Sequence, residues 1–187
     1  LENLDSAISD IYYCNFSVFQ SIPDSWAIDQ LFPVMPIHRL KEFPENNAII
    51  ADITCDCDGK LDRFIDLHDV NTTLPLHKLT DEEYYIGIFL VGAYQETLGD
   101  LHNLFGDTNV VSVRINGDGD YDLVSEIHGD SVKDVLSYVE FDIPKMRSDF
   151  RKTAEDAVKT GLVTAKERRE IMTSFDNGLN GYTYYER

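Results

Sequence analysis

The sequence predicts an α+β fold in which a β-rich region is followed by a helical C-terminal segment. Apolar runs and alternating segments, separated by turn residues, dominate up to about residue 130. Apolar residues at helical spacing then continue to the end of the chain. A length of 187 residues with 43% hydrophobic content is enough for a sizeable buried core.

The predicted organisation has three parts. Residues 1–12 are expected to be the end of an upstream helix, because apolar residues from Leu1 to Ile8 recur at helical spacing. Residues 13–130 are expected to form a β domain, and residues 131–187 a helical subdomain. The chain starts at Leu1 in the middle of a pattern, so we interpret it as a piece of a larger protein.

Strands are expected in the β domain wherever apolar or alternating runs lie between turn residues. Residues 84–93 are apolar throughout, which is typical of a central strand covered on both faces. Prolines between residues 13 and 44 exclude long helices and central strands there. The sequence Asn-Gly-Asp-Gly-Asp at 116–120 indicates a hairpin turn. The predicted strands are 48–54, 63–67, 84–93, 110–115 and 121–127.

Three helices are predicted after residue 130 from their end signals. Ser131 can cap the first of them. Pro144 opens the second helix, and Gly161 ends it. Thr164 and Glu167 have the spacing of a capping box for the third.

The charge of the chain is strongly acidic and unevenly distributed. A net charge of −18 argues against nucleic acid and anionic membranes as partners and favours a cationic substrate. Residues 145–170 differ from the rest, since they hold eight of the 16 basic residues. This stretch is either a solvated helix face or a surface that docks on the acidic body or on a partner subunit.

Cysteine usage and hydropathy indicate a reducing, cytoplasmic setting. The number of cysteines is odd, and their spacing is not that of a disulfide framework. The three are Cys14, Cys55 and Cys57. The longest apolar run, residues 84–94, is too short to span a membrane, and no signal peptide is evident.

The segment Ile53-Thr54-Cys55-Asp56-Cys57-Asp58-Gly59 is the strongest candidate site. It follows an apolar run that predicts a buried strand, so a thiol and two carboxylates are delivered to one turn. Neighbouring negative charge disfavours a thiolate, which suits Cys55 to donating a proton. The carboxylates of Asp56 and Asp58 suit a cationic ligand. The alternative is an ordinary Asp-Gly turn beside a buried cysteine.

Metal-binding motifs fit this segment poorly, so no metal site is predicted. An EF-hand loop aligned on Gly59 has Thr54 at its first position and Ile65 at its twelfth, where acids are required. One Cys-x-Cys pair without a histidine pair at ligand spacing does not make a zinc site.

Two further motifs admit either a functional or a structural role. Tyr94 follows the apolar run 84–93, where its hydroxyl could meet a ligand or its ring could be a rim aromatic. His102 and Asn103 could be a pair of site residues or part of an ordinary loop.

Longer motifs resemble the C-terminal part of the bacterial biosynthetic arginine decarboxylases. This family belongs to the alanine-racemase-like, fold type III group of pyridoxal-phosphate enzymes. The resemblance runs nearly from end to end. Its motifs are NFSVFQS (15–21), PDSWAIDQLFP (23–33), DITCD (52–56), VGAYQE (91–96), HNLFG (102–106) and GLNGYTY (178–184).

The resemblance implies separate roles for the residues of the Cys55 turn. Cys55 would reach across a dimer interface and protonate the α-carbon of the substrate after CO2 leaves. Asp56 would bind the guanidinium of the substrate through two hydrogen bonds, with Asp58 adding to it. Cys57 departs from the family pattern, which usually has Ser there.

The resemblance also implies a cofactor, partners and an architecture. The β domain would be a barrel or sandwich that packs on an N-terminal TIM-like barrel, which carries the lysine that binds pyridoxal 5′-phosphate. Tyr94 would approach the cofactor phosphate, and His102 and Asn103 would line the substrate pocket. Mg²⁺ is a candidate second ion, and the assembly would be a dimer or a dimer of dimers.

The function implied is conversion of L-arginine to agmatine and CO2 in polyamine and spermidine biosynthesis. The chain alone is expected to be inactive, because the Schiff-base lysine would lie in the barrel. The alternatives are a non-catalytic acidic module that binds a cation, and a degenerate regulatory paralogue.

Overall fold

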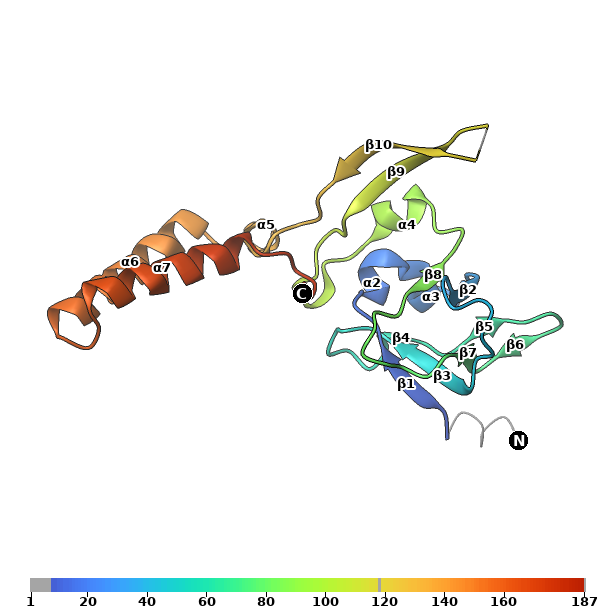
Figure 1. Cartoon of the computed structure of the whole chain (residues 1–187). Helices are drawn as coiled ribbons and strands as arrows, with labels where there is room; N and C mark the ends of the chain where they lie inside the picture. Colours follow the sequence, from blue (N-terminus) through green and yellow to red (C-terminus); the bar gives the residue numbers. More distant parts are fainter. Residues whose placement is uncertain (1–7, 118, 187) are drawn as a thin grey trace. The chain divides into compact units, whose positions relative to one another are not determined.

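A computed structural model describes residues 8–117 and 119–186 of the chain (Figure 1). The contacts of the chain divide it into two compact units, Leu1–Asn103 and Leu104–Arg187. The first unit combines small sheets with short helices, and the second combines one hairpin with the long helices. The predicted α+β class, with a helical segment at the C-terminus, is confirmed.

The main sheet of the first unit is built around strand β3, Asn46–Ala51. Strand β1, Asp10–Tyr13, pairs with it in parallel, and β4, Lys60–Leu61, pairs with it antiparallel. The fourth strand, β7, Leu74–Leu76, pairs antiparallel with the first half of β3. The buried strand predicted at 48–54 is therefore present, but it ends at Ala51, so residues 52–54 belong to the turn that follows.

Strand β1 corrects the helix expected over residues 1–12. Residues 1–7 lie outside the described residues, but Asp10–Tyr13 is extended and aligned residue by residue with 48–51 of β3. Helical spacing of a few apolar residues is a weak signal, and pairing with a neighbouring strand decides the conformation here.

Two short helices follow β1 and help to form the core. Helix α2, Val18–Ser21, is capped by Ser17, whose hydroxyl accepts a hydrogen bond from the backbone of Gln20. Helix α3, Pro23–Ala27, has its proline at the first turn, where no N–H is needed. The core cluster contains Tyr12, Val18, Ile22, Ala48, Ile50, Leu61, Phe64, Leu74 and Leu76.

The strand expected at 84–93 is much shorter than predicted. Strand β8 spans only Ile86–Ile88 and pairs with a single neighbour, β2, Val34–Pro36. Leu90 has a φ of 61°, which a strand cannot accommodate, and its side chain is 85% exposed. The apolar run is therefore not a central strand covered on both faces, since it bends out of the sheet before helix α4, Ala93–Leu98, begins.

A second small sheet replaces the strand expected at 63–67. Strand β5 covers only Phe64–Ile65 and pairs with β6, Val70–Asn71.

The second unit begins with the predicted hairpin. Strands β9, Val110–Ile115, and β10, Tyr121–Ile127, pair antiparallel, with a register shift between Leu123 and Ser125. The hairpin falls in the second unit, whereas the sequence placed it in a β domain ending at residue 130. Apolar side chains exposed on these strands are Val111, Val113, Ile115, Tyr121, Leu123, Val124 and Ile127.

The predicted helix ends are confirmed in this unit. Helix α5, Val132–Tyr138, has Ser131 at its N-cap, and helix α7, Ala165–Asn180, has the capping box of Thr164 and Glu167. Helix α6, Ile143–Lys159, has Pro144 in its first turn.

Helices α6 and α7 lie side by side (Figure 1). They pack through stacked rings of Phe150 and Phe175, whose centroids are 4.2 Å apart. Gly161, with a φ of 75°, supplies the left-handed turn after α6.

The basic stretch 145–170 is largely paired within this helical hairpin. Arg147 forms two hydrogen bonds to the carboxylate of Asp176, at 2.6 and 2.7 Å. Other ion pairs in the stretch join Lys145 to Asp149, Lys159 to Asp156, Lys166 to Glu170, and Arg168 to Glu155. This local pairing favours a solvated helix face over a docking surface. Among the described residues, no helix has the length and apolar character needed to cross a membrane.

Candidate functional site

The buried carboxylate of Asp52 organises the turn that leaves strand β3. Asp52 is only 2% exposed, yet its two oxygens accept three hydrogen bonds. The donors are the backbone N–H of Val18 at 2.9 Å, the backbone N–H of Thr54 at 2.9 Å, and the Thr54 hydroxyl at 2.7 Å. A buried acid with this many donors fixes the direction of the chain as it enters residues 53–58.

Gly59 closes the turn and lies directly against the Asp52 side chain. The backbone N–H of Asp52 donates to the carbonyl of Gly59 at 2.8 Å. A Cβ atom on Gly59 would lie 2.2 Å from Asp52 Oδ1 and 2.6 Å from Thr54 Oγ1. Glycine is therefore required here for close approach, and not because of its φ angle.

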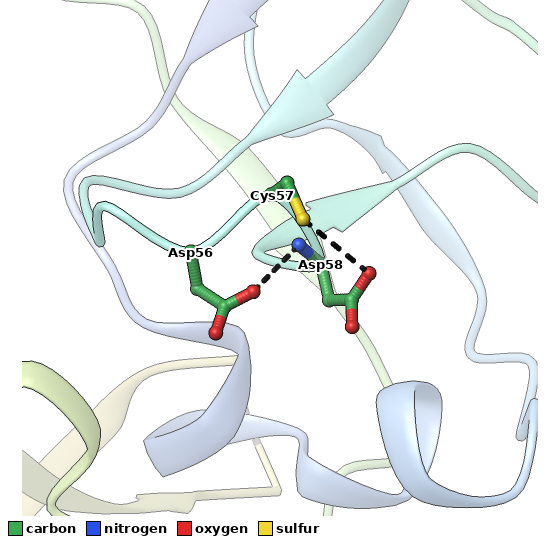
Figure 2. Close-up of side chains that lie close together, drawn as sticks. All are labelled: Asp56, Cys57 and Asp58. Carbon is green, nitrogen blue, oxygen red and sulfur yellow. Dashed lines mark hydrogen bonds between the residues drawn. The ribbon is translucent and has the colours of Figure 1, made fainter.

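The tip of the turn presents two thiols and two carboxylates. Cys55, Cys57 and Asp58 are exposed, and the Asp56 side chain is 31% exposed. Figure 2 shows the Asp56 carboxylate accepting the backbone N–H of Asp58, at 2.9 Å. The pKa of Asp56 is lowered, first by this backbone hydrogen bond and then by a side-chain hydrogen bond from His102. Asp56 is therefore a carboxylate at neutral pH, as binding of a cation requires.

His102 and Asn103 meet this turn from a segment more than 45 residues away along the chain. His102 Nε2 lies 3.0 Å from Asp56 Oδ2. Asn103 Nδ2 donates a hydrogen bond to Cys55 Sγ at 3.1 Å. The structure thus brings together Cys55, Asp56, His102 and Asn103, four of the residues that the sequence singled out.

Aromatic side chains support the same cluster. The Phe19 ring packs on the His102 ring, with centroids 4.2 Å apart. The Trp26 ring contacts Phe19 edge-on at 5.2 Å, and its indole N–H lies 3.4 Å from Asp58 Oδ2. Phe19 therefore supports the His102 ring, and Trp26 holds the turn through Asp58.

Three of these supporting residues were not predicted as part of the site. Asp52, Phe19 and Trp26 lie in motifs 15–21, 23–33 and 52–56, which carried the resemblance without receiving roles. The signal available for Asp52 was an acid placed directly after a buried strand, where it would need hydrogen-bond donors. The sequence held no comparable signal for the aromatic contacts.

Tyr94 is located differently from the expectation. It lies in helix α4, after the N-cap Gly92, and does not end a strand. The side chain is 69% exposed, and no described residue donates to or accepts from its hydroxyl. Helix α4 is held by Gln95, whose side-chain amide exchanges two hydrogen bonds with Asp24. Tyr94 is therefore accessible, but no interaction within residues 8–117 and 119–186 joins it to the Cys55 turn.

Asp56, Cys57 and Asp58 form a group whose ligand atoms lie within 4.8 Å of one another. Mg²⁺ requires near-octahedral oxygen coordination, and a sulfur in the group suits it poorly. The trio therefore does not fit Mg²⁺. Its two carboxylates suit an organic cation, which needs hydrogen-bond acceptors and negative charge.

Comparisons with known proteins show what the chain is similar to. Residues 132–185 match the family described as the arginine decarboxylase C-terminal helical extension. The biosynthetic arginine decarboxylase of Gloeobacter violaceus is 50% identical over 98% of this chain and 29% of its own length. The chain corresponds to the C-terminal part of the biosynthetic arginine decarboxylases. A second such relative, from Phocaeicola vulgatus, is also 50% identical over 98% of the chain.

A solved structure agrees with this relationship. The crystal structure of the biosynthetic arginine decarboxylase SpeA from Campylobacter jejuni matches with a TM-score of 0.82 and 36% sequence identity. The match covers 94% of this chain and 29% of the Campylobacter enzyme. The chain therefore spans less than a third of the length of the arginine decarboxylases to which it is related.

Proposed function

We propose that this chain is the C-terminal part of an enzyme that converts L-arginine to agmatine and CO2, as a step of polyamine biosynthesis in the cytoplasm. The observation that carries the proposal is the 50% identity, over 98% of the chain, with an enzyme named biosynthetic arginine decarboxylase. The clustering of Cys55 and Asp56 with His102 and Asn103 supports it independently, because the two pairs lie more than 45 residues apart in sequence.

Asp56 is proposed to anchor the guanidinium of the substrate. Its carboxylate is ionised, half-buried and fixed by the Asp58 backbone and by His102, so little reordering is needed when a cation binds. A planar guanidinium can place two parallel hydrogen bonds on such a carboxylate. Asp58, held by Trp26, would add a second negative charge beside it.

Cys55 is proposed to return the proton to the α-carbon of the substrate. Its thiol is exposed at the tip of the turn and is oriented by Asn103. A proton donor that meets a substrate held by another part of the protein must be accessible in this way. Pyridoxal 5′-phosphate, bound mainly by the preceding part of the protein, would supply the electron sink for decarboxylation. Tyr94, with an accessible hydroxyl, would donate a hydrogen bond to the phosphate of this cofactor.

The working protein is proposed to be a homo-oligomer that includes an N-terminal TIM-like barrel. The relatives are more than three times as long as this chain, which leaves room for such a domain. The exposed apolar side chains of hairpin β9–β10 also favour a larger assembly, since exposed apolar surface often marks a contact with another protein surface.

Expression of the chain alone, and of a full-length protein that ends in it, tests this proposal. We expect agmatine formation and cofactor absorbance only from the full-length protein, since the Schiff-base lysine would lie outside the chain. In that protein, Cys55→Ala should lower the rate on the order of 10²–10⁴-fold. Cys57→Ser is the matched control and should retain activity. An unaltered rate in Cys55→Ala would exclude this thiol as the proton donor.

A second candidate is a non-catalytic module that binds a cation through Asp56, Cys57 and Asp58. Its support is the spacing of these groups, within 4.8 Å of one another. Calorimetric titration of the chain with Ca²⁺ separates the two candidates. Tight Ca²⁺ binding with a change in structure would favour the module, whereas the absence of Ca²⁺ binding would exclude the module and leave the arginine decarboxylase proposal.

A further inference from the structure

The adjacent residues His102 and Asn103 each contact one of two adjacent residues in the cysteine turn, Asp56 and Cys55. Asn103 Nδ2 donates to Cys55 Sγ at 3.1 Å, and His102 Nε2 lies 3.0 Å from Asp56 Oδ2. We propose that His102 and Asn103 are positioning residues, which hold the proton donor and the guanidinium anchor in place and do not themselves contact the substrate. This proposal rests on the proposed function and specifies how the site is built.

The first support is that both sides of the contact are anchored on the same element. Helix α2, Val18–Ser21, holds the cysteine turn because the Val18 N–H donates to the buried Asp52 at 2.9 Å. The same helix holds the other segment, since the N–H of Asp100 donates to the carbonyl of Phe19 at 3.1 Å. The Phe19 ring then packs on His102 at 4.2 Å. The two segments are thus fixed relative to each other before any ligand binds.

The second support is the backbone of the segment itself. Asn103 has φ 56° and ψ 22°, which is the left-handed conformation, and Leu104 follows with a φ of 62°. Asparagine tolerates this conformation better than most residues, whereas leucine rarely adopts it. A turn of this kind is kept where side chains must be aimed in a set direction.

The third support is that the polar atoms of His102 and Asn103 nearest the turn already have partners. Asn103 Nδ2 is hydrogen-bonded to the sulfur of Cys55, and His102 Nε2 is hydrogen-bonded to the carboxylate of Asp56. A substrate contact through these atoms would break the hydrogen bonds that orient Cys55 and Asp56. A carboxylate can accept about four hydrogen bonds, so Asp56 keeps acceptor capacity after binding Asp58 and His102. The Cys55 side chain is exposed and therefore remains accessible to a substrate.

Thiol alkylation of the 187-residue chain tests the Asn103 contact without any need for catalysis. Cys57→Ser is the background, so that Cys55 is the exposed thiol that reacts. Asn103→Gly removes the amide but keeps the left-handed backbone accessible. Because Asn103 Nδ2 is the donor that holds Cys55 Sγ, its loss frees the thiol, and we expect Asn103→Gly to change the rate of alkylation by iodoacetamide about 3–10-fold. Asn103→Asp, which has a similar shape but no N–H donor, should change the rate in the same direction.

Equal alkylation rates in the parent and in both Asn103 variants would overturn the positioning role of Asn103. Fluorescence of Trp26, the single tryptophan of the chain, verifies that the fold around the turn is retained in each variant. This result stands whether or not the protein decarboxylates arginine, so it is separable from failure of the proposed function.

Double-mutant cycles in the full-length protein test the link to catalysis. If His102 acts only through Asp56, His102→Ala should raise the KM for arginine about tenfold in the parent and have little further effect in Asp56→Ala. Likewise, Asn103→Gly should lower kcat in the parent but not in Cys55→Ala. Independent, additive losses in both cycles would overturn the proposal and would instead make His102 and Asn103 substrate contacts.

Discussion

The two units of the chain differ in how their structure arises. The second unit is built from the hairpin β9–β10 and from helices α5, α6 and α7, whose ends follow local signals such as the Thr164–Glu167 capping box. In the first unit, the elements near the site are two to six residues long and depend on contacts between distant segments. The buried carboxylate of Asp52 directly after β3, the Phe19 ring, and His102 and Asn103 together build the site. The first unit should therefore be far more sensitive to single changes at its turns.

Different probes allow the units to be followed separately. Trp26, the one tryptophan in the sequence, lies in the first unit and reports on it by fluorescence. Far-ultraviolet circular dichroism is dominated by the long helices, which belong to the second unit.

The largest expected effect is that of Gly59→Ala in the first unit. The new Cβ would lie 2.2 Å from Asp52 Oδ1, so the buried carboxylate and its three hydrogen bonds must shift. We expect a loss of roughly 3 kcal/mol, in the range of substitutions that disrupt a buried polar network. Urea unfolding followed by Trp26 fluorescence measures it, and an unchanged midpoint would show that the turn is not rigid.

A smaller effect should come from alkaline titration of Cys14. Burial raises the pKa of this thiol from 9.0 to about 11. The stability from this group is complete below about pH 9 and is lost as the pH rises through about 11, which amounts to roughly 2–3 kcal/mol. The difference in unfolding free energy between the parent and Cys14→Ala should therefore shrink over this range. A difference independent of pH would contradict the assignment.

In the second unit, removal of a helix cap should cost less. The Thr164 hydroxyl accepts the backbone N–H of Glu167 at 3.2 Å and closes the first turn of α7. Thr164→Ala should lower stability by about 1 kcal/mol. Thermal unfolding monitored by circular dichroism measures it, with Thr164→Ser as the control that keeps the hydroxyl. The Trp26 signal should be unaffected, and a coupled change would mean that the units unfold together.

The smallest effect, with the opposite sign, is expected for Gly178→Ala in α7. A Cβ at this position meets no atom within 4 Å, in contrast to Gly59. Alanine also restricts the unfolded chain and favours the helix, so a gain of about 0.5–1 kcal/mol is expected. A less stable Gly178→Ala variant, or a more stable Gly59→Ala variant, would contradict the contrast drawn between the two units.

The sequence by itself determined the helical end of the chain, the hairpin and the identity of the candidate site residues. Helix caps such as Ser131 and Thr164 act over three or four residues, so they can be recognised without the fold. The hairpin β9–β10 follows for the same reason, since its turn and its alternation are local. The resemblance singled out Cys55 and Asp56 from motifs that are continuous in sequence.

Tertiary structure alone decided the rest of the first unit. The apolar run 84–93 has the composition of a central strand, but a partner on one edge only and the left-handed Leu90 limit it to three residues. The contacts of His102 and Asn103 with the cysteine turn depend on segments nearly 50 residues apart meeting on helix α2. Such contacts are set by packing and by buried hydrogen bonds, which a local pattern of residues does not encode.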